Sequence, residues 1–368
     1  MSAPAFELAP ALEAHEPPEA RGVARDGVRM LVARRSDGSI EHRTFSDLPE
    51  LLAPGDVLVI NVSATIPAAV PARRRDGEAV RVHFATRAPH LEDVWRVVEI
   101  RSADGSRPRR IPVGERLELR GGATLDLVVP YASGERLTLA RLRCALLVDD
   151  KAPPSGAADL PTKAPPSGAA DLPKYLERHG EPIRYAHIPR PWPLQDYQNV
   201  YAISPGSAEM PSAGRPVTRD LISRLISREI VVAPVTLHCG VSSPESHEPP
   251  FPEWYEVPER TAHAIAVARE RGGRVIAVGT TVVRALESAG GPDRCSCARS
   301  GWTGLVVTSE CGVSVVDGLI TGWHEPQASH LQLLEALMGP ELLARSYEAA
   351  LDAGYLWHEF GDSHLILP

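Results

Sequence analysis

The sequence predicts an α/β protein that carries a second, smaller part made only of β-strands. Between residues 78 and 147, short alternating runs are separated by Gly, Pro and Asp turns and none has a helical period, as in a small barrel or sandwich. From about residue 217, apolar strands alternate with amphipathic helices, which indicates an α/β layer with partly parallel strands. The length of 368 residues, 43% of them hydrophobic, predicts two or three domains with substantial cores.

The N-terminal part begins with residues 1–24, which are rich in Pro, Ala and Glu and which we expect to pack loosely. Two apolar runs, 28–32 and 56–60, then predict strands, the second of them after the turn Pro54-Gly55. The all-β part contains five further predicted strands, at residues 79–84, 94–100, 116–119, 124–129 and 137–147.

A tandem repeat follows the all-β part. The sequence KAPPSGAADLP stands at residues 151–161 and again at residues 163–173. A single short repeat cannot build a solenoid, which needs several longer units. Its Pro, Ser, Gly and Ala content predicts a duplicated surface loop, and a spacer or docking segment is the alternative.

The last third of the chain alternates between the strand and helix periods. Thr218 is placed to cap a helix whose apolar stripe consists of Leu221, Ile222, Leu225 and Ile226. The other predicted elements are strands at 230–237 and 274–278, helices that begin at Pro258 and after Gly279, and helices at 326–338 and 341–352.

Composition narrows the classes of protein. The formal net charge of −8 argues against a strongly basic nucleic-acid binder, although a local Arg patch would still bind RNA. We expect no transmembrane helix, because no window approaches 18 apolar residues, and no signal peptide, because residues 1–22 lack a basic start. Five irregularly spaced Cys fit the reducing cytoplasm, so we predict a cytoplasmic protein and favour a monomer.

The turn Gly279-Thr280-Thr281 is the most informative local feature. It joins an apolar strand to a helix and therefore places backbone N–H groups and two hydroxyls at a helix N-terminus, which suits a carboxylate or phosphate. Arg284 and Glu287 are one turn apart on that helix and so reach the same side. The alternative is an ordinary strand, turn and helix with a surface ion pair.

Other candidate residues lie next to strands or loops. His238 ends an apolar strand, where ligand groups collect in α/β sheets, and the alternative is a structural histidine. Glu253 and Tyr255 follow a Pro-rich loop. Glu253 is a candidate general base beside an aromatic ring, and the alternative is that the aromatic residues anchor that loop. Trp323 and His324 precede a helix, and we expect no metal there because no ligand pair has zinc spacing.

Several motifs point together to a family. They are LAPGDVLVIN at 52–61, YQNVYA at 197–202, PSAG at 211–214, VTLHCG at 235–240, EWY at 253–255, RVIAVGTTVVRALES at 274–288 and VDGL at 316–319. With these motifs in this order, the chain resembles the S-adenosylmethionine:tRNA ribosyltransferase-isomerase family of queuosine biosynthesis from about Arg25 to the C-terminus.

The resemblance implies a larger mixed-sheet α/β domain with a smaller inserted β-barrel. We accordingly assign residues 25–77 and 151–368 to the α/β domain and residues 78–150 to the barrel. The resemblance also implies that S-adenosylmethionine is the co-substrate and donates its ribosyl moiety to a deazaguanine base in tRNA. No metal is implied. The moiety is isomerised to give epoxyqueuosine, and adenine and methionine are released.

The resemblance also assigns roles to residues. His238, Glu253 and Arg284 are the candidates for catalysis, the first two for proton transfer, because the sulfonium acidifies the adjacent C5′ hydrogen. The candidates for binding the donor are Ser212, Tyr255, Gly279, Thr280, Thr281, Glu287, Trp323 and His324.

The sequence departs from the usual family pattern in several places. After Asn61 the family usually reads Asp-Thr-Arg, where this chain has Val62-Ser63-Ala64. After Gly214 it usually reads Leu-His-Phe-Thr, where this chain has Arg215-Pro216-Val217-Thr218. These losses of polar groups favour two alternatives: a paralogue that transfers part of S-adenosylmethionine to a small-molecule acceptor, or a silent member that binds RNA or nucleoside.

Overall fold

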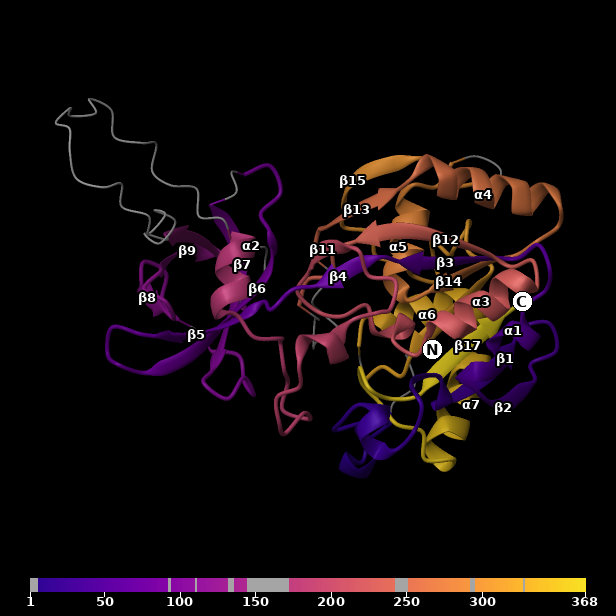
Figure 1. Ribbon diagram of the computed structural model, residues 1–368, viewed down its shortest axis with the longest axis horizontal. Helices are drawn as coiled ribbons and strands as arrows, with labels where there is room; N and C mark the ends of the chain where they lie inside the picture. Colours follow the sequence, from indigo (N-terminus) through magenta and orange to yellow (C-terminus); the bar gives the residue numbers. More distant parts are fainter. Residues whose placement is uncertain are drawn as a thin grey trace, which may run out of the picture. The chain divides into compact units, whose positions relative to one another are not determined.

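The computed structural model describes residues 6–91, 94–109, 111–131, 136–143, 172–241, 251–291, 295–326 and 328–368. The chain divides into a small unit, Ile66–Ala186, and a large unit, Met1–Thr65 with His187–Pro368 (Figure 1). The small unit is thus an insertion within the sequence of the large one. The predicted class, a mixed α/β domain with an inserted barrel, is confirmed.

The large unit is built on one nine-stranded sheet. Its strands are β1 (Arg29–Arg34), β2 (Ile40–Thr44), β3 (Val57–Asn61), β12 (Val231–Leu237), β13 (Glu253–Val257), β14 (Val275–Val278), β15 (Arg299–Thr303), β16 (Gly318–Gly322) and β17 (Ser363–Leu367). Their order is β15-β13-β12-β3-β14-β16-β17-β1-β2, and the neighbours from β12 to β16 are parallel. A separate pair, β4 (Ser63–Thr65) and β11 (Ser204–Ser207), is also parallel.

The central strand β3 is buried on both faces, which explains its unbroken apolar sequence. Val57 and Val59 belong to one core, and Leu58 and Ile60 belong to the core on the opposite face. This division follows from the strand period of two. The parallel part of the sheet is therefore a layer between two hydrophobic cores.

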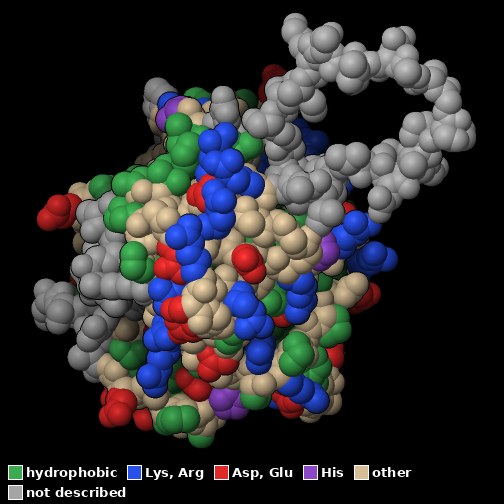
Figure 2. Space-filling model, turned by 90° about the vertical axis from the view of Figure 1, so that its left-hand side faces the viewer, with side chains coloured by type: hydrophobic (Ala, Val, Ile, Leu, Met, Phe, Trp, Pro, Cys, Tyr) green, Lys and Arg blue, Asp and Glu red, His purple; other side chains and the backbone are tan. Residues whose placement is uncertain are grey.

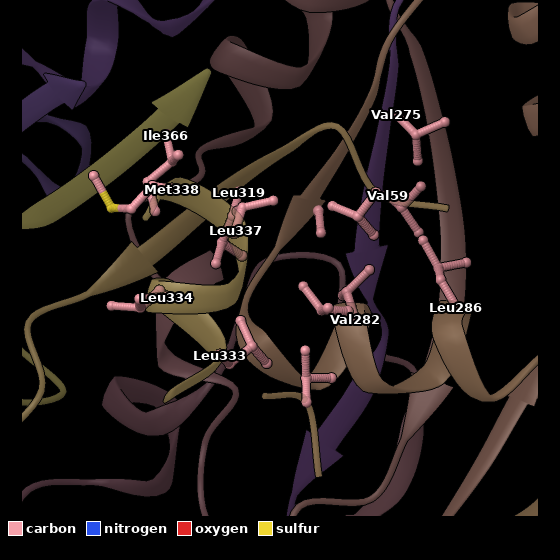
Figure 3. Packing of buried hydrophobic residues seen from close by; sticks show 14 of the residues in the cluster. Val59, Val275, Val282, Leu286, Leu319, Leu333, Leu334, Leu337, Met338 and Ile366 are labelled. Carbon is pink, nitrogen blue, oxygen red and sulfur yellow. The ribbon is translucent and has the colours of Figure 1, made fainter. Parts of the chain in front are cut away.

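Helices cover the two faces unequally. Helix α3 (Arg219–Ser227) and the short helix α1 (Leu48–Leu51) contribute to the core on one face of the sheet. The helices α4 (Glu259–Glu270), α5 (Thr280–Ser288), α6 (His330–Met338) and α7 (Pro340–Asp352) contribute to the other core. Figure 3 shows Val59 of β3 in that core with Val282 and Leu286 of α5.

The small unit contains a closed barrel with the strand order β10-β7-β6-β5-β8-β9. The strands are β5 (Ala69–Arg73), β6 (Ala79–Arg87), β7 (Trp95–Ser102), β8 (Arg116–Leu119), β9 (Thr124–Pro130) and β10 (Leu137–Arg143), and the unit also holds helix α2 (Leu172–His179). The structural unit begins earlier and ends later than the residues 78–150 that we assigned to the barrel, because β5 closes it and α2 packs within the unit.

Some segments differ from expectation. Residues of the N-terminal segment form short 3-10 helices, and Ala14 is buried while the backbone of Glu13 bridges to Trp357. The helix predicted from residue 326 begins at His330. The tandem repeat, for which we predicted a loop, lies outside the described residues except for its last two, which begin α2.

Candidate active site at the carboxyl ends of the parallel strands

The connections that follow two neighbouring parallel strands, β3 and β14, lie on opposite faces of the sheet. The connection from β3 to β12 includes α3 on one face, whereas α5 follows β14 directly on the other. Such a divergence opens a crevice at the carboxyl ends of the strands, where α/β proteins bind ligands. The residues at these ends are Asn61, His238 and the turn Gly279–Thr281.

Asn61 joins the three strand ends. Its Oδ1 accepts hydrogen bonds from the N–H of Leu237 (3.0 Å) and of Ser63 (3.1 Å). Its Nδ2 donates to the carbonyl of Leu237 (2.8 Å) and to the hydroxyl of Thr281 (3.3 Å). The side chain is 1% exposed, so these bonds to neighbours take the place of water. Asn61 therefore fixes the ends of β3, β12 and β14 relative to one another.

The turn after β14 has the geometry that the sequence predicts. Gly279 has a φ of 98°, which disfavours a side chain, and its N–H donates to the carbonyl of Ile320 (2.8 Å). Thr280 begins α5, and the hydroxyl of Thr281 faces Asn61. A Cβ added at Gly279 would lie 3.5 Å from Ala213, so the segment with Ser212 borders this turn.

Ser212 also lines a small cleft in the large unit. The cleft is bounded by the 3-10 helix Ser212–Gly214, by Gly322 at the end of β16 and by Asp362. Asp362 is engaged there, since it accepts hydrogen bonds from the backbone and guanidinium of Arg29. Ser212 thus lines the same cleft as Gly322, the last residue of β16.

His238 is held on three sides. Its Nδ1 lies 2.8 Å from the hydroxyl of Ser63, which lies 2.6 Å from the hydroxyl of Ser207. The ring stacks on Trp254 with centroids 5.4 Å apart. On another side the backbone of Gly206 comes so close that an added Cβ would lie 2.5 Å from the imidazole. The hydrogen bonds also link His238 through Ser63 to Asn61.

Glu253 and Arg284 form a buried ion pair. The carboxylate of Glu253 also accepts the N–H of Gly240 (2.6 Å), two residues after His238. The guanidinium of Arg284 donates in addition to the carbonyls of Leu305 (3.0 Å) and Thr303 (3.2 Å). The exposed fractions are 9% for Glu253 and 8% for Arg284. Arg284 is therefore engaged with protein acceptors, and it ties α5 to β13 and β15.

Glu287 and Tyr255 are engaged within the large unit as well. The carboxylate of Glu287 accepts hydrogen bonds from the hydroxyl of Ser314 (2.8 Å) and from the N–H groups of residues 314–316. Glu287 and Arg284, one turn apart, thus hold different segments. Tyr255 is buried in the core, and its hydroxyl donates to the carbonyl of Ser288 (3.3 Å). The polar groups of both side chains are therefore bonded to other parts of the large unit.

Trp323 and His324 begin a group of stacked rings after β16. Trp323 is buried and stacks on His364 at 4.8 Å, and His324 stacks on His330 at 4.5 Å. The Nε2 of His324 lies 2.8 Å from the hydroxyl of Thr321. Burial holds the pKa of His324 well below its usual range and lowers the pKa of His330 to about 4. Both rings are therefore neutral at pH 7.

The structure adds residues that we did not select from the sequence. Asn61, Ser63 and Ser207 connect the predicted residues His238 and Thr281 through hydrogen bonds. Asn61 could have been selected from the sequence, because it is a polar residue at the end of an apolar run. Ser207 and Gly206 could not have been, because they approach His238 only through the pairing of β11 with β4.

Two further findings concern metals and membranes. Among the described residues, no three or more His, Cys, Asp or Glu side chains are grouped so as to hold a metal ion. No helix within the described ranges has the length and apolar character needed to cross a membrane.

Comparison with known proteins identifies relatives along the whole chain. The model of a family described as "Queuosine biosynthesis protein" matches residues 1–366. The S-adenosylmethionine:tRNA ribosyltransferase-isomerase of Heliobacterium modesticaldum is 33% identical over 354 residues, which cover 93% of this chain and 94% of that protein. The protein of the same name from Gloeobacter violaceus is 36% identical over 362 residues, 94% of this chain and 90% of that one.

A solved structure agrees with these relatives. The crystal structure of an S-adenosylmethionine tRNA ribosyltransferase from Thermotoga maritima matches with a TM-score of 0.52 and 26% identity, covering 98% of this chain and 99% of that one. The similarity therefore extends over both units in sequence and in fold. This chain belongs to the S-adenosylmethionine:tRNA ribosyltransferase-isomerase family.

Proposed function

We propose that the protein transfers and isomerises the ribosyl moiety of S-adenosylmethionine onto a deazaguanine-modified base of tRNA, with release of adenine and methionine. The observation that carries this proposal is the network Thr281–Asn61–Ser63–His238 at the carboxyl ends of β3, β12 and β14. It joins a helix N-terminus suited to an anion and a histidine suited to proton transfer, in a chain of this family.

His238 is the base in this proposal. Removing the C5′ proton next to the sulfonium requires a group that accepts a proton near pH 7, which is the range of imidazole. The hydroxyl of Ser63 at Nδ1 orients the ring, and Gly206 and Trp254 hold its plane. The proton taken from the donor is available for the departing adenine.

The donor is held by the turn Gly279–Thr281 and by Ser212. The N–H groups at the start of α5 and the hydroxyls of Thr280 and Thr281 suit the methionine carboxylate. Glu253 and Arg284 act as positioning residues, because their ion pair fixes Gly240 and the start of α5 around His238. Tyr255, Glu287, Trp323 and His324 contact other residues of the large unit, and in this proposal they do not contact the donor.

A small-molecule acceptor is the second candidate. It is favoured by Val62 and Ala64, which stand beside Ser63 at the end of β3 where the family usually has an acid and an arginine. The loss of those two charges affects the part of the site next to His238. An acceptor that lacks the charges of tRNA would need fewer such contacts.

One experiment separates the two candidates. The protein is incubated with S-adenosylmethionine, with and without tRNA that carries the aminomethyl-deazaguanine base, and adenine and methionine are measured by liquid chromatography. Release that depends on the tRNA is the expected result. Release without tRNA would support the small-molecule acceptor, and no release in either reaction would refute both.

A matched pair of variants tests the role of His238. His238→Asn is expected to lower the rate of adenine release by at least about a hundredfold, as for the loss of a general base. His263→Asn is the control, because His263 is an exposed residue of α4. Equal rates for the two variants would show that His238 is not the base.

A further inference from the structure

The two units carry opposite charge. Residues 66–186 contain 20 Lys and Arg against 16 Asp and Glu, whereas the rest of the chain contains 19 against 31. The overall negative charge of the protein therefore belongs to the large unit alone. A net positive unit within an acidic protein is a mark of a surface for an anionic partner.

Part of this positive charge lies in one line across the barrel. Arg116 of β8 is the register partner of Asp126 of β9, and Asp126 is the partner of Arg141 of β10. Arg141 is in turn the partner of Trp95 of β7. Neighbouring residues of β8, β9 and β10 on the opposite face of the strands are buried: Leu117, Leu125 and Leu142. The row therefore faces outward.

We call Arg116, Asp126, Arg141, Trp95 and the adjacent Arg143 the arginine row. Asp126 accepts hydrogen bonds from Nε of Arg116 (2.5 Å) and from Nε of Arg143 (2.6 Å). The hydrogen bond from Arg116 holds the pKa of the Asp126 carboxyl below its usual range. The carboxylate of Asp126 thus pairs with two guanidinium groups, and with Arg141 the row has three arginines against one carboxylate and a net positive charge.

Two of the three arginine side chains in the row are exposed, and Arg141 is half-buried. The side chains of Arg116 and Arg143 are 48% and 53% exposed. Arg141 lies over the ring of Trp95, with its guanidinium carbon 6.0 Å from the ring centroid. Figure 2 shows Lys and Arg side chains, with Asp and Glu among them, on the face turned toward the viewer.

We propose that the arginine row is a docking surface for the sugar-phosphate backbone of RNA. Guanidinium groups bind phosphate by paired hydrogen bonds, and an aromatic ring beside them offers a stacking surface for a base. The choice of RNA rests on the proposed function, because the relatives are named for their action on tRNA. An acidic protein is the alternative partner for such a row.

The test uses the full chain and unmodified tRNA, so that binding is measured without turnover. In the variant Arg116→Ala/Arg141→Ala/Arg143→Ala, affinity at about 0.1 M salt is expected to fall at least about tenfold. The slope of log affinity against log salt is expected to become shallower by about 2–3, since each lost phosphate contact contributes roughly one.

The control variant removes the same charge from the large unit. Arg219, Arg228 and Arg271 are exposed there, and their joint change to Ala is expected to leave affinity and slope close to wild type. An equal loss in both variants would attribute the effect to bulk charge and overturn the proposal. Wild-type affinity in the barrel variant would overturn it as well.

The remaining outcomes separate this inference from the proposed function. Weaker tRNA binding by the barrel variant would support the row even if the wild type released no adenine. Adenine release that depends on tRNA, together with unchanged binding by the barrel variant, would overturn the row and leave the activity standing. Tighter binding of wild type to polyglutamate than to tRNA would assign the row to an acidic protein and overturn the proposal.

Discussion

At the scale of single residues, the proposed function depends on one imidazole, that of His238, which its neighbours hold in place. His238 contacts Ser63 through Nδ1, Trp254 through its ring face and Gly206 through the backbone. The family usually has Thr at the position of Ser63, so the hydroxyl is retained although its neighbours have changed. In the proposed role of base, an imidazole held in this way is expected to need little reorganisation before it accepts a proton.

Two conservative substitutions test the role of the Ser63 hydroxyl. Ser63→Ala is expected to lower kcat for adenine release about tenfold, since a lost hydrogen bond of on the order of 1.4 kcal/mol leaves Nδ1 unpaired. Ser63→Thr keeps the hydroxyl and is expected to keep activity within about twofold. If Thr loses as much activity as Ala, or if the pH profile of kcat is the same in Ala and wild type, the hydroxyl does not orient the base.

Gly206 is a second contact of the same ring. A Cβ at this position would lie 2.5 Å from the imidazole, so Gly206→Ala is expected to displace His238 and to lower kcat. Overpacking of this kind costs about 1–3 kcal/mol of unfolding free energy, which denaturant titration measures. Gly304→Ala is the control, because nothing lies within 4 Å of the added Cβ there. Full activity in Gly206→Ala would contradict the close contact.

At the scale of elements, the three strands that carry the candidate site were predictable from the sequence, whereas the partners of α5 were not. Period and turn residues predicted β3, β12, β14 and their helices because those signals are local. The ion pair of α5 joins Arg284 to Glu253, a residue far upstream on β13, which no spacing within a helix can reveal. Similarly, β5 is short and contains Pro71, so its sequence resembles a loop.

The ion pair between α5 and β13 is expected to matter for stability. Arg284→Met leaves the carboxylate of Glu253 buried without its cation, and the unfolding free energy is expected to fall by about 3–5 kcal/mol. The double variant Glu253→Gln/Arg284→Met removes both charges and is expected to recover part of that loss. Denaturant titration of wild type, Arg284→Met, Glu253→Gln and the double variant measures the coupling between the two residues. Additive losses in the double variant would show that the pair is not coupled.

We expect a buried histidine of strand β17 to make the unfolding free energy depend on pH. Burial lowers the pKa of His364 to about 3, and neither ring nitrogen has a hydrogen-bond partner among the described residues. The unfolded chain binds a proton below about pH 6.5 and the folded chain does not, so stability falls as pH decreases from 6.5. At pH 5 this one group costs on the order of 2 kcal/mol.

Replacing His364 tests the direction in which the unfolding free energy changes with pH. His364→Phe keeps an aromatic ring on Trp323 and cannot be protonated, so the loss of stability between pH 7 and pH 5 is expected to shrink by on the order of 2 kcal/mol. His263→Asn, on the exposed side of α4, is expected to leave the dependence unchanged. The same pH dependence in wild type and His364→Phe would show that His364 titrates normally.

At the scale of the whole molecule, the two units have separate hydrophobic cores. The barrel closes on itself, and the core clusters of the large unit contain no residue between 66 and 186. Trp95 is the one tryptophan of the small unit, while the other five lie in the large unit. Its fluorescence therefore reports on the barrel alone once the other signals are subtracted.

We expect unfolding in two transitions rather than one. Leu125→Ala creates a cavity in the barrel, and it is expected to shift only one transition, by about 2–5 kcal/mol. The matching change in the large unit, Leu286→Ala, is expected to shift the other. Scanning calorimetry and the difference in fluorescence between wild type and Trp95→Phe measure the two. A single transition that both variants shift equally would show one cooperative unit.

The topology of the sheet has a consequence for synthesis of the protein. Strand β1 lies between β2 and β17, and β17, residues 363–367, is the last of the sheet's strands in sequence order. During synthesis the interior of the sheet is therefore incomplete until residues 363–367 have left the ribosome. The barrel, finished much earlier, is free to fold during elongation. Until β17 has emerged, the large unit has exposed strand edges, so we expect chaperones to bind it during this interval.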